Sequence, residues 1–219
     1  MTEFISPFGP MIMHSKLSDE CFNILRANAN DSRHEDLDFR QKLSGNIHYE
    51  YKINFKTLEH KNLVVTELLS FAKQYVNACR EQYRVKRFNE VKAKNLQIID
   101  PIWVNFMRNG EWNPVHFHAG QISCVTYLSI PREINEENKV DPSVAQSNQP
   151  TAGKIQWTYG EAMHFSQTFY TKTPREQDIF LFPADLKHFV YPFKTNAERV
   201  SVSCNFIAPN FKIAKNSLD

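Results

Sequence analysis

Hydrophobic residues recur at intervals of three and four between His60 and Tyr83, and this spacing predicts a long amphipathic helix. Its apolar stripe consists of Leu63 or Val64, Leu68, Ala72, Tyr75 or Val76, Cys79 and Tyr83. We expect this helix to lie across the outside of a sheet. A shorter helix is predicted to start after Ser18, because Asp19 and Glu20 would place acidic side chains in its first turn.

After Asn95 the pattern changes to short runs rich in β-branched and aromatic residues, separated by turn residues. The runs predict strands at 96–99, 102–107, 115–117, 122–130, 154–159, 168–171, 179–182, 189–191 and 199–207. Such spacing is typical of an antiparallel barrel or sandwich. Residues 132–153 are poor in apolar side chains, so we expect a long mobile loop there.

The length of 219 residues fits one domain with a full core. We expect a mainly β fold with supporting helices, in which residues 1–95 form a helical support region. Residues 96–209 would form the β core, and 210–219 a tail. An aromatic content of 13%, with 17 Phe, agrees with sheets whose packed faces are lined with rings.

Composition and charge limit the possible partners and location. A net charge of +2 is too small to favour nucleic acid or an anionic membrane as a partner. Four widely spaced cysteines without a Cys-x-x-Cys motif indicate a reducing compartment. No apolar run approaches the ~20 residues of a membrane span, and the N-terminus lacks a secretory signal pattern. We therefore expect a cytoplasmic location, which would be the host cytoplasm if the protein is viral.

The first candidate for chemistry is the pair His116 and His118, which follows turn-like residues and leads into a strand-like run. In a strand, residues i and i+2 project from the same face, roughly 6–7 Å apart at the backbone. Two neutral imidazoles on one face form half of a metal site. The alternative is that both rings lie on the surface or pack within a sheet.

Two later segments favour the metal site. His188 ends a strand-like run about seventy residues further on, and a jelly roll brings such distant strands together. On the next run, Arg199 and Ser201 share a face, and a buried guanidinium is costly unless it meets an anion such as a carboxylate. Tyr127 could reach the same carboxylate, although it could equally be a core tyrosine.

Taken together, these segments resemble a known family. His116-x-His118, the Phe-Pro-Ala-Asp-Leu-x-His188 segment and Arg199-x-Ser201 are similar to motifs of the iron(II)- and 2-oxoglutarate-dependent oxygenases. The resemblance is to the prolyl-hydroxylase-like branch, which includes small oxygenases of phages and marine bacteria, and it covers about residues 96–209. It implies a double-stranded β-helix, a jelly roll of the cupin-like kind, with the N-terminal helices packed on one sheet.

The resemblance also implies an activity and a set of residue roles. The enzyme would be a dioxygenase that hydroxylates an unidentified substrate, prolyl or otherwise amino-acid-like, with 2-oxoglutarate and O2 as cosubstrates and succinate and CO2 as products. His116, His118 and His188 would bind iron(II). Arg199 would pair with the distal carboxylate of 2-oxoglutarate, supported by Ser201 and Tyr127. Candidates for the substrate entrance, each with barrel packing as the alternative, are Trp103, Asn105, Trp112 and Trp157.

One departure from the family concerns position 118, where the usual metal-binding triad of two histidines and one carboxylate has Asp or Glu. Either three histidines bind the metal here, or His118 is a bystander and another group such as Gln121 completes the site. We favour three histidines. His164 is a weaker candidate ligand in an expected loop.

Two other functions stay open at this level. A cupin-type metalloprotein would bind a metal through His-x-His without 2-oxoglutarate, but it would normally have Glu where Gln121 stands, and Arg199 would have no role. A non-catalytic jelly-roll module would bind neither ligand.

Overall fold

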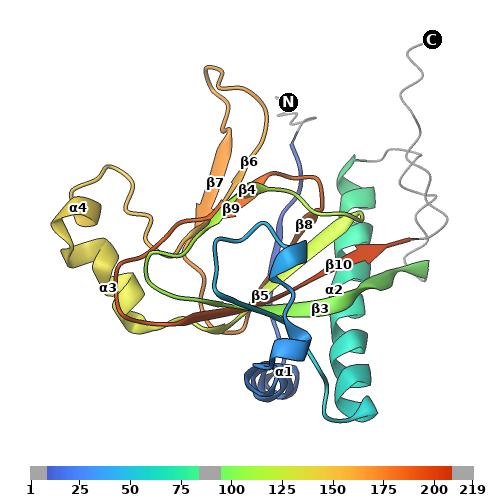
Figure 1. The fold of residues 1–219 in the computed structure, drawn as a ribbon. Helices are drawn as coiled ribbons and strands as arrows, with labels where there is room; N and C mark the ends of the chain where they lie inside the picture. Colours follow the sequence, from blue (N-terminus) through green and yellow to red (C-terminus); the bar gives the residue numbers. More distant parts are fainter. Residues whose placement is uncertain (1–8, 84–94, 209–219) are drawn as a thin grey trace.

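The protein consists of two antiparallel sheets with helices along one side (Figure 1). A computed structural model describes residues 9–83 and 95–208. In the larger sheet, six strands are arranged in the order β1 (Met13–Lys16), β8 (Asp178–Pro183), β5 (Ile122–Ser129), β10 (Arg199–Ile207), β3 (Gln97–Met107) and β2 (Tyr49–Lys52). The smaller sheet has the order β4 (Asn113–His116), β9 (His188–Val190), β6 (Ile155–Thr158) and β7 (Phe169–Lys172).

Strands far apart in the sequence are neighbours in both sheets. The last strand, β10, lies between β3 and β5, and β4 pairs with β9 across more than seventy intervening residues. This order of antiparallel strands in two sheets is that of a jelly roll, so the predicted fold class is confirmed.

Two hydrophobic clusters hold the layers together. One lies between the helices and the larger sheet and includes Leu25, Leu68 and Phe106. The other lies between the two sheets and includes Trp157 and Phe182. The interior between the sheets is therefore partly an apolar core and partly a pocket with polar lining.

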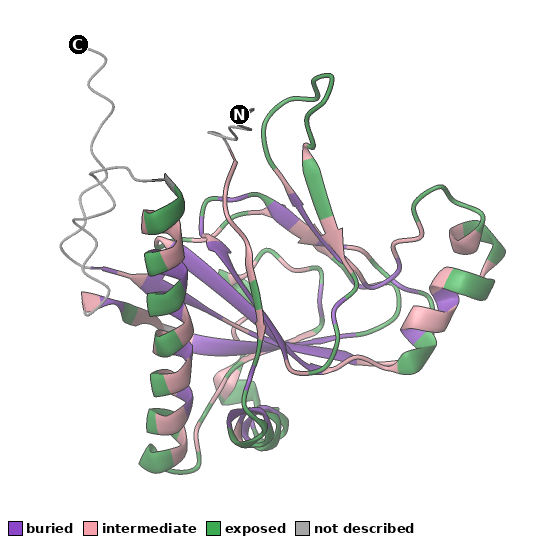
Figure 2. Cartoon of the chain, turned by 180° about the vertical axis from the view of Figure 1, so that it is seen from behind, coloured by how far each residue is buried: buried purple, intermediate pink, exposed green. Residues whose placement is uncertain are grey.

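The two long helices cover one face of the larger sheet, with their buried sides turned toward it (Figure 2). The predicted long helix is α2 (Leu58–Tyr83), and its stripe residues Val64, Leu68 and Ala72 are fully buried. The predicted shorter helix is α1 (Asp19–Asp31). The Ser18 hydroxyl accepts a hydrogen bond from the Cys21 N–H at 3.1 Å, which caps the first turn.

The prediction of a mobile loop over 132–153 was wrong. This segment contains two helices, α3 (Arg132–Val140) and α4 (Pro142–Ala145). A helix that packs by one narrow side needs few apolar residues, and here Ile134 supplies that contact. The buried carboxylate of Glu137 attaches α3 to the chain, because it accepts hydrogen bonds from the N–H groups of Lys194 and Thr195.

The runs at 96–99 and 102–107 were predicted as separate strands, but they form the single strand β3. Pro101, which lacks an N–H to donate, lies within it. The pairing of β3 with β10 shifts register between Ser203 and Asn205, opposite this position. Such an irregularity lets a strand continue past a proline.

Two shorter elements precede β2, the 3-10 helices η1 (Glu35–Leu37) and η2 (Arg40–Lys42). Within the described ranges, no helix has the length and apolarity that crossing a bilayer requires. The division of the chain at residue 95 stays a prediction, and the expected tail 210–219 lies outside the described residues.

Candidate metal centre and adjoining pocket

Three imidazoles meet where β4 and β9 pair. His116 at the end of β4 lies opposite His188 at the start of β9, and His118 follows two residues after His116. The chain at His118 is held by its N–H, which donates to the carbonyl of Ala184 at 2.8 Å. One ring nitrogen from each of the three residues lies within 4.8 Å of the others. Two metal–nitrogen bonds of about 2 Å span at most about 4 Å, so these nitrogens are near the spacing that one shared ion requires.

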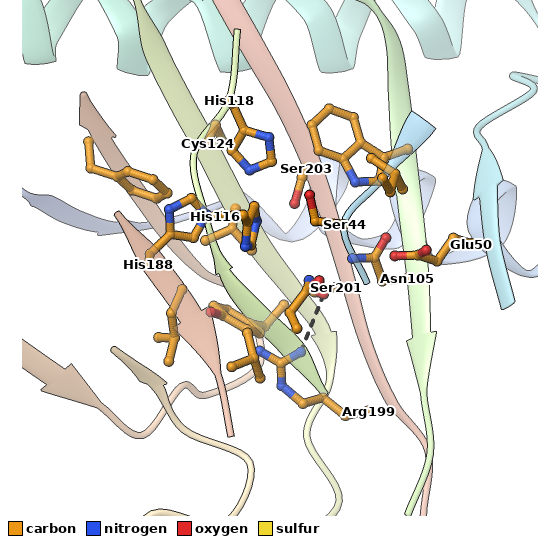
Figure 3. Close-up of a pocket in the computed structure, with 18 residues that line it drawn as sticks. Ser44, Glu50, Asn105, His116, His118, Cys124, His188, Arg199, Ser201 and Ser203 are labelled. Atoms are coloured by element: carbon orange, nitrogen blue, oxygen red, sulfur yellow. Dashed lines mark hydrogen bonds between the residues drawn. The ribbon is translucent and has the colours of Figure 1, made fainter. Parts of the chain in front are cut away.

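The side chains alternate along this segment as the period of a strand requires. Val115 and Phe117 are exposed, whereas His116 and His118 turn inward (Figure 3). The ring centroids of His116 and His188 are 4.3 Å apart, and that of His118 lies 4.9 Å from His116 and 5.1 Å from His188. The expected convergence of the three histidines is thus present in the geometry.

Backbone carbonyls orient two of the three rings. Nδ1 of His116 lies 2.6 Å from the Pro114 oxygen, and Nδ1 of His188 lies 2.9 Å from the Leu186 oxygen. A carbonyl can only accept, so each Nδ1 carries the proton and donates it. The Nε2 lone pair of each ring is left available to a metal ion, which is a common arrangement around histidine ligands.

Burial keeps the three imidazoles neutral. Desolvation lowers the pKa of His188 to about 3, with His116 and His118 contributing in the same direction. It lowers the pKa of His118 to about 4 and also lowers that of His116. Neutral imidazole is the form that binds metals, so the site needs no proton release near pH 7.

The same pocket contains an unpaired cation. The Arg199 side chain, at the start of β10, is only 2% exposed, and among the described residues its Nε and Nη2 have no hydrogen-bond partner. Nη1 lies 3.5 Å from Ser201 Oγ, and the guanidinium carbon lies 4.8 Å from the centroid of the Tyr127 ring. Because an unpaired buried charge is strongly unfavourable, the arrangement indicates a binding site for an anion.

Two neutral hydroxyl groups accompany this cation. Tyr127 is fully buried, and its hydroxyl has no partner within the described part of the chain. Burial raises the pKa of Tyr127 to about 12, so the phenol is protonated and can donate. Ser201 lies beside it, directly opposite across the β5–β10 pair.

These residues belong to a row that crosses the larger sheet. Glu50 on β2 pairs with Asn105 on β3, Asn105 pairs with Ser201 on β10, and Ser201 pairs with Tyr127 on β5. Residues in register share a face of the sheet, so all four side chains turn toward the smaller sheet and line one pocket with the three histidines (Figure 3).

Several residues that line the pocket were not predicted from the sequence, and Glu50, Ser44 and Ser203 are among them. A signal existed for Glu50, because Tyr49 and Tyr51 alternate with it in a short strand and pack against the helix-side cluster. Glu50 must then face the opposite side of the sheet. The sequence did not reveal that this side is an interior pocket.

The four substrate-entrance candidates separate into two groups. Trp103 and Asn105 line the pocket, and the Trp103 ring lies 5.6 Å from that of His118. Trp157 does not line it, because its ring packs on Phe180 and Phe182 inside the core. Trp112 is also outside the lining, since its backbone bridges to Asn46 and its side chain is 41% exposed.

The two alternative ligands from the sequence lie elsewhere. Gln121 accepts a hydrogen bond through its side-chain oxygen from the Ala208 N–H at 2.7 Å, at the far end of β10. His164 is exposed in the loop between β6 and β7. The histidine cluster therefore does not include them.

Comparison with known proteins agrees with this geometry. Residues 101–205, from β3 to β10, match the family described as "Putative 2OG-Fe(II) oxygenase". This segment, somewhat less than half of the chain, is therefore similar to the 2OG-Fe(II) oxygenases. The matched segment contains every residue of the histidine cluster as well as Arg199, Ser201 and Tyr127. No curated protein matches the sequence.

Several solved structures share the fold of this chain at low identity. AviO1 from Streptomyces viridochromogenes Tue57 is 11% identical with a TM-score of 0.57, over 92% of this chain and 91% of that one. HygX from Streptomyces hygroscopicus, solved with nickel, 2-oxoglutarate and hygromycin B, is 11% identical with a TM-score of 0.53, over 94% and 85%. A prolyl hydroxylase from Trichoplax adhaerens, solved with a peptide of hypoxia inducible factor, is 15% identical with a TM-score of 0.52, over 91% and 84%.

Proposed function

We propose that this oxygenase holds iron(II) through His116, His118 and His188 and binds 2-oxoglutarate through Arg199. The observation that carries the proposal is the coexistence of three neutral imidazoles and an unpaired, buried guanidinium in one pocket. HygX, which shares the fold, was solved with nickel and 2-oxoglutarate bound, and this supports the assignment. When bound, iron(II) would activate O2 with 2-oxoglutarate as the reductant, so that one oxygen atom enters the hydroxylated substrate and the other enters succinate, with release of CO2.

Each protein group has a defined task in this assignment. The guanidinium of Arg199 fits a carboxylate with two parallel hydrogen bonds, and its free Nε and Nη2 are available for them. Tyr127 and Ser201 can add neutral donors to the same anion. The surrounding apolar core excludes water, which strengthens these interactions.

The third histidine changes the charge of the site but does not prevent binding. Iron(II) carries two positive charges, and the three neutral imidazoles leave both uncompensated. The two carboxylates of 2-oxoglutarate balance them, so that together with the Arg199 guanidinium the loaded pocket carries one net positive charge. We infer that the metal is held less tightly before the cosubstrate binds than in a site with a carboxylate ligand.

The assignment is tested by adding iron(II) and 2-oxoglutarate to the protein without oxygen. A visible charge-transfer band from the chelate is expected, and Arg199→Met should prevent its formation while leaving metal binding intact. A cupin-type metalloprotein would bind the metal without the band. A binding module without a metal site would bind neither, and either of these results would refute the proposal.

We also infer that the protein is cytoplasmic. All four of its cysteines are free thiols, and Cys21, Cys124 and Cys204 are buried. Unpaired buried thiols are typical of reducing compartments. Fractionation of cells that express the native protein tests this location.

A further inference from the structure

The structure contains four buried carboxylates among the described residues, and one of them differs from the rest. They are Glu50, Glu111, Glu137 and Asp178. Both oxygens of the last three accept hydrogen bonds from nearby groups, namely His48 and Arg108 for Glu111, Lys194 and Thr195 for Glu137, and His14 and Arg175 for Asp178. Neither oxygen of Glu50 has a partner among residues 9–83 and 95–208, although its side chain is fully buried.

A second acceptor without a donor lies beside Glu50. The side-chain oxygen of Asn105, its cross-strand neighbour, is buried and unpaired within the described residues. Figure 3 shows the Glu50 and Asn105 side chains directed toward one another at the edge of the pocket, away from the histidines. Three acceptor oxygens thus gather at one place. Buried acceptors normally have partners, so this group requires an explanation.

The surroundings of Glu50 make it a site for positive charge. Burial raises the pKa of Glu50 to about 8, and the carboxylates of Glu111 and Asp38 act in the same direction, opposed by Arg40. Arg199, at the other end of the pocket, is not among the groups that perturb it. A cation next to Glu50 would remove the penalty on its ionised form.

The backbone of residues 43–46 passes close to Glu50 at the edge of the pocket. Leu43 and Ser44 line the pocket. The Asn46 N–H donates to the Trp112 carbonyl at 3.0 Å and holds this segment in place. A Cβ on Gly45 would stand 2.6 Å from Oε1 of Glu50. The backbone therefore runs so close to the carboxylate that any larger residue at position 45 would require the Glu50 side chain to shift.

We propose that Glu50 and Asn105 form the substrate-recognition end of the pocket and bind an ammonium group of the substrate. This proposal rests on the proposed function, because it assigns the opposite end of the pocket to iron(II) and 2-oxoglutarate. An ammonium group has three donors and no acceptor, and so matches three unpaired oxygens. Next to the ionised form of Glu50, a hydroxyl group has only one donor and would leave two of these oxygens unsatisfied.

The distribution of charge fits this orientation. At one end of the pocket, the guanidinium of Arg199 has no anionic partner among the described residues. At the other end, the carboxyl group of Glu50 has no cationic partner among them. The histidines lie beside the region between them, on the smaller sheet (Figure 3). A substrate anchored at Glu50 by its amine would present its neighbouring carbon atoms toward the metal site.

The test uses n-propylamine and n-propanol, which have similar size and differ in the ammonium group. The full chain, loaded with zinc(II) and 2-oxoglutarate, is titrated with each probe while carbon NMR follows the carboxyl signals of labelled glutamates. Propylamine should bind and move the Glu50 signal to the ionised position, and propanol should not. Glu50→Gln, which preserves shape, should weaken propylamine binding at least about tenfold.

Two further variants complete the design. Asn105→Ala should weaken propylamine binding severalfold, whereas Glu137→Gln, which alters a fully partnered buried acid, should leave it unchanged. Equal affinity of propylamine for the native protein and Glu50→Gln would overturn the proposal, as would equal binding of propanol. A shift of the Glu50 signal by magnesium or calcium ions in place of the amine would overturn it as well.

The iron–2-oxoglutarate band separates the two proposals. The band should form normally in Glu50→Gln, because Glu50 does not face the cosubstrate site. If the band forms in the native protein but Glu50→Gln does not change the affinity for propylamine, only the proposed ammonium site is wrong. If the native protein gives no band, the proposed function itself fails.

Discussion

The buried guanidinium of Arg199 lacks the hydrogen-bond partners that a buried charge normally requires. The fold buries its guanidinium against Tyr127 and Met107 and leaves two of its nitrogens unpaired. Burial lowers the pKa of Arg199, which means that the protein disfavours the charge it contains. In the proposed function, the carboxylate of 2-oxoglutarate supplies the missing interactions.

Replacing Arg199 with methionine should separate stability from binding. Arg199→Met removes an unpaired buried charge and retains much of the volume, so the free energy of unfolding of the ligand-free protein should be unchanged or higher. The affinity for 2-oxoglutarate should fall at least about 30-fold, from the loss of a buried charged hydrogen-bonding partner. Chemical denaturation and calorimetric titration measure the two effects. Ser201→Ala is the milder comparison, and unchanged affinity in Arg199→Met would contradict the assignment.

His118 decides whether the metal has three imidazole ligands. His118→Ala should lower the affinity for a divalent metal at least about 100-fold, since it removes a ligand and not merely its support. His118→Asp restores the carboxylate of the usual triad and should retain binding. Anaerobic calorimetric titration gives these affinities. Gln121→Ala is the matched control. If Gln121→Ala lowered the metal affinity and His118→Ala did not, Gln121 and not His118 would be the third ligand.

Glu50 should impose a pH dependence on stability. Its pKa is about 8 in the folded protein against an ordinary value of 4.5, so the folded state holds one more proton than the unfolded state between these values. The free energy of unfolding should therefore be largest below about pH 4.5 as far as this group is concerned. It should fall as pH rises toward 8, by at most about 1.4 kcal/mol per unit.

Denaturation of the native protein and Glu50→Gln across this pH range isolates the contribution of this one group. The difference between the two free energies of unfolding should change steadily from about pH 5 to pH 8 and level off above it. Parallel profiles would show that Glu50 is ionised in the folded state, in contact with a cation that the structure does not reveal.

At the scale of elements, α3 shows how one buried carboxylate can hold a polar segment in place. Glu137 is 5% exposed and accepts from the Lys194 N–H, the Thr195 N–H and the Thr195 hydroxyl, with the last two at 2.9 and 2.7 Å. These bonds join the helix to the turn that precedes β10. Gly153, with φ of +68°, lies directly under Ile134 and allows the chain to return.

Glu137→Gln should destabilise the protein without altering the pocket. The amide places a donor against groups that are themselves donors, so the free energy of unfolding should fall by about 1–3 kcal/mol. Glu133→Gln on the exposed side of the same helix should change it by less than about 0.5 kcal/mol. Thermal or chemical denaturation compares the two. Equal stability of both variants would mean that α3 does not depend on this contact.

At the scale of the whole molecule, the candidate site joins the two sheets. His116 and His188 belong to the β4–β9 pair of the smaller sheet and His118 follows β4, whereas Arg199, Ser201 and Tyr127 come from β10 and β5 of the larger. Metal and cosubstrate bound together would therefore connect both layers. This connection should appear as a change in global stability.

Loading with iron(II) and 2-oxoglutarate should raise the melting temperature. At about 100 times the dissociation constant, a ligand specific for the folded state adds roughly 2.7 kcal/mol, which for a chain of this size corresponds to about 5–10 °C. Differential scanning calorimetry without oxygen measures the shift, and a chelator should reverse it. In Arg199→Met, 2-oxoglutarate should add nothing beyond the effect of the metal.

The sequence by itself determined the features that depend on local periodicity. The period of two placed His116 and His118 on one face, and the period of 3.6 defined the buried stripe of α2, because both follow from backbone geometry within a few residues. The combination of the histidine motif with Arg199 and Ser201 also sufficed to indicate the oxygenase resemblance. These inferences needed no knowledge of which strands are neighbours.

Only the tertiary structure decided which side chains meet and which are buried without partners. The row from Glu50 to Tyr127 exists because four strands distant in sequence share one register, and a shift by one residue would turn each side chain to the opposite face. For the same reason Trp157 is core and Trp103 lines the pocket, although both looked alike in the sequence. Burial and pairing are properties of the packed sheets, and a local pattern does not contain them.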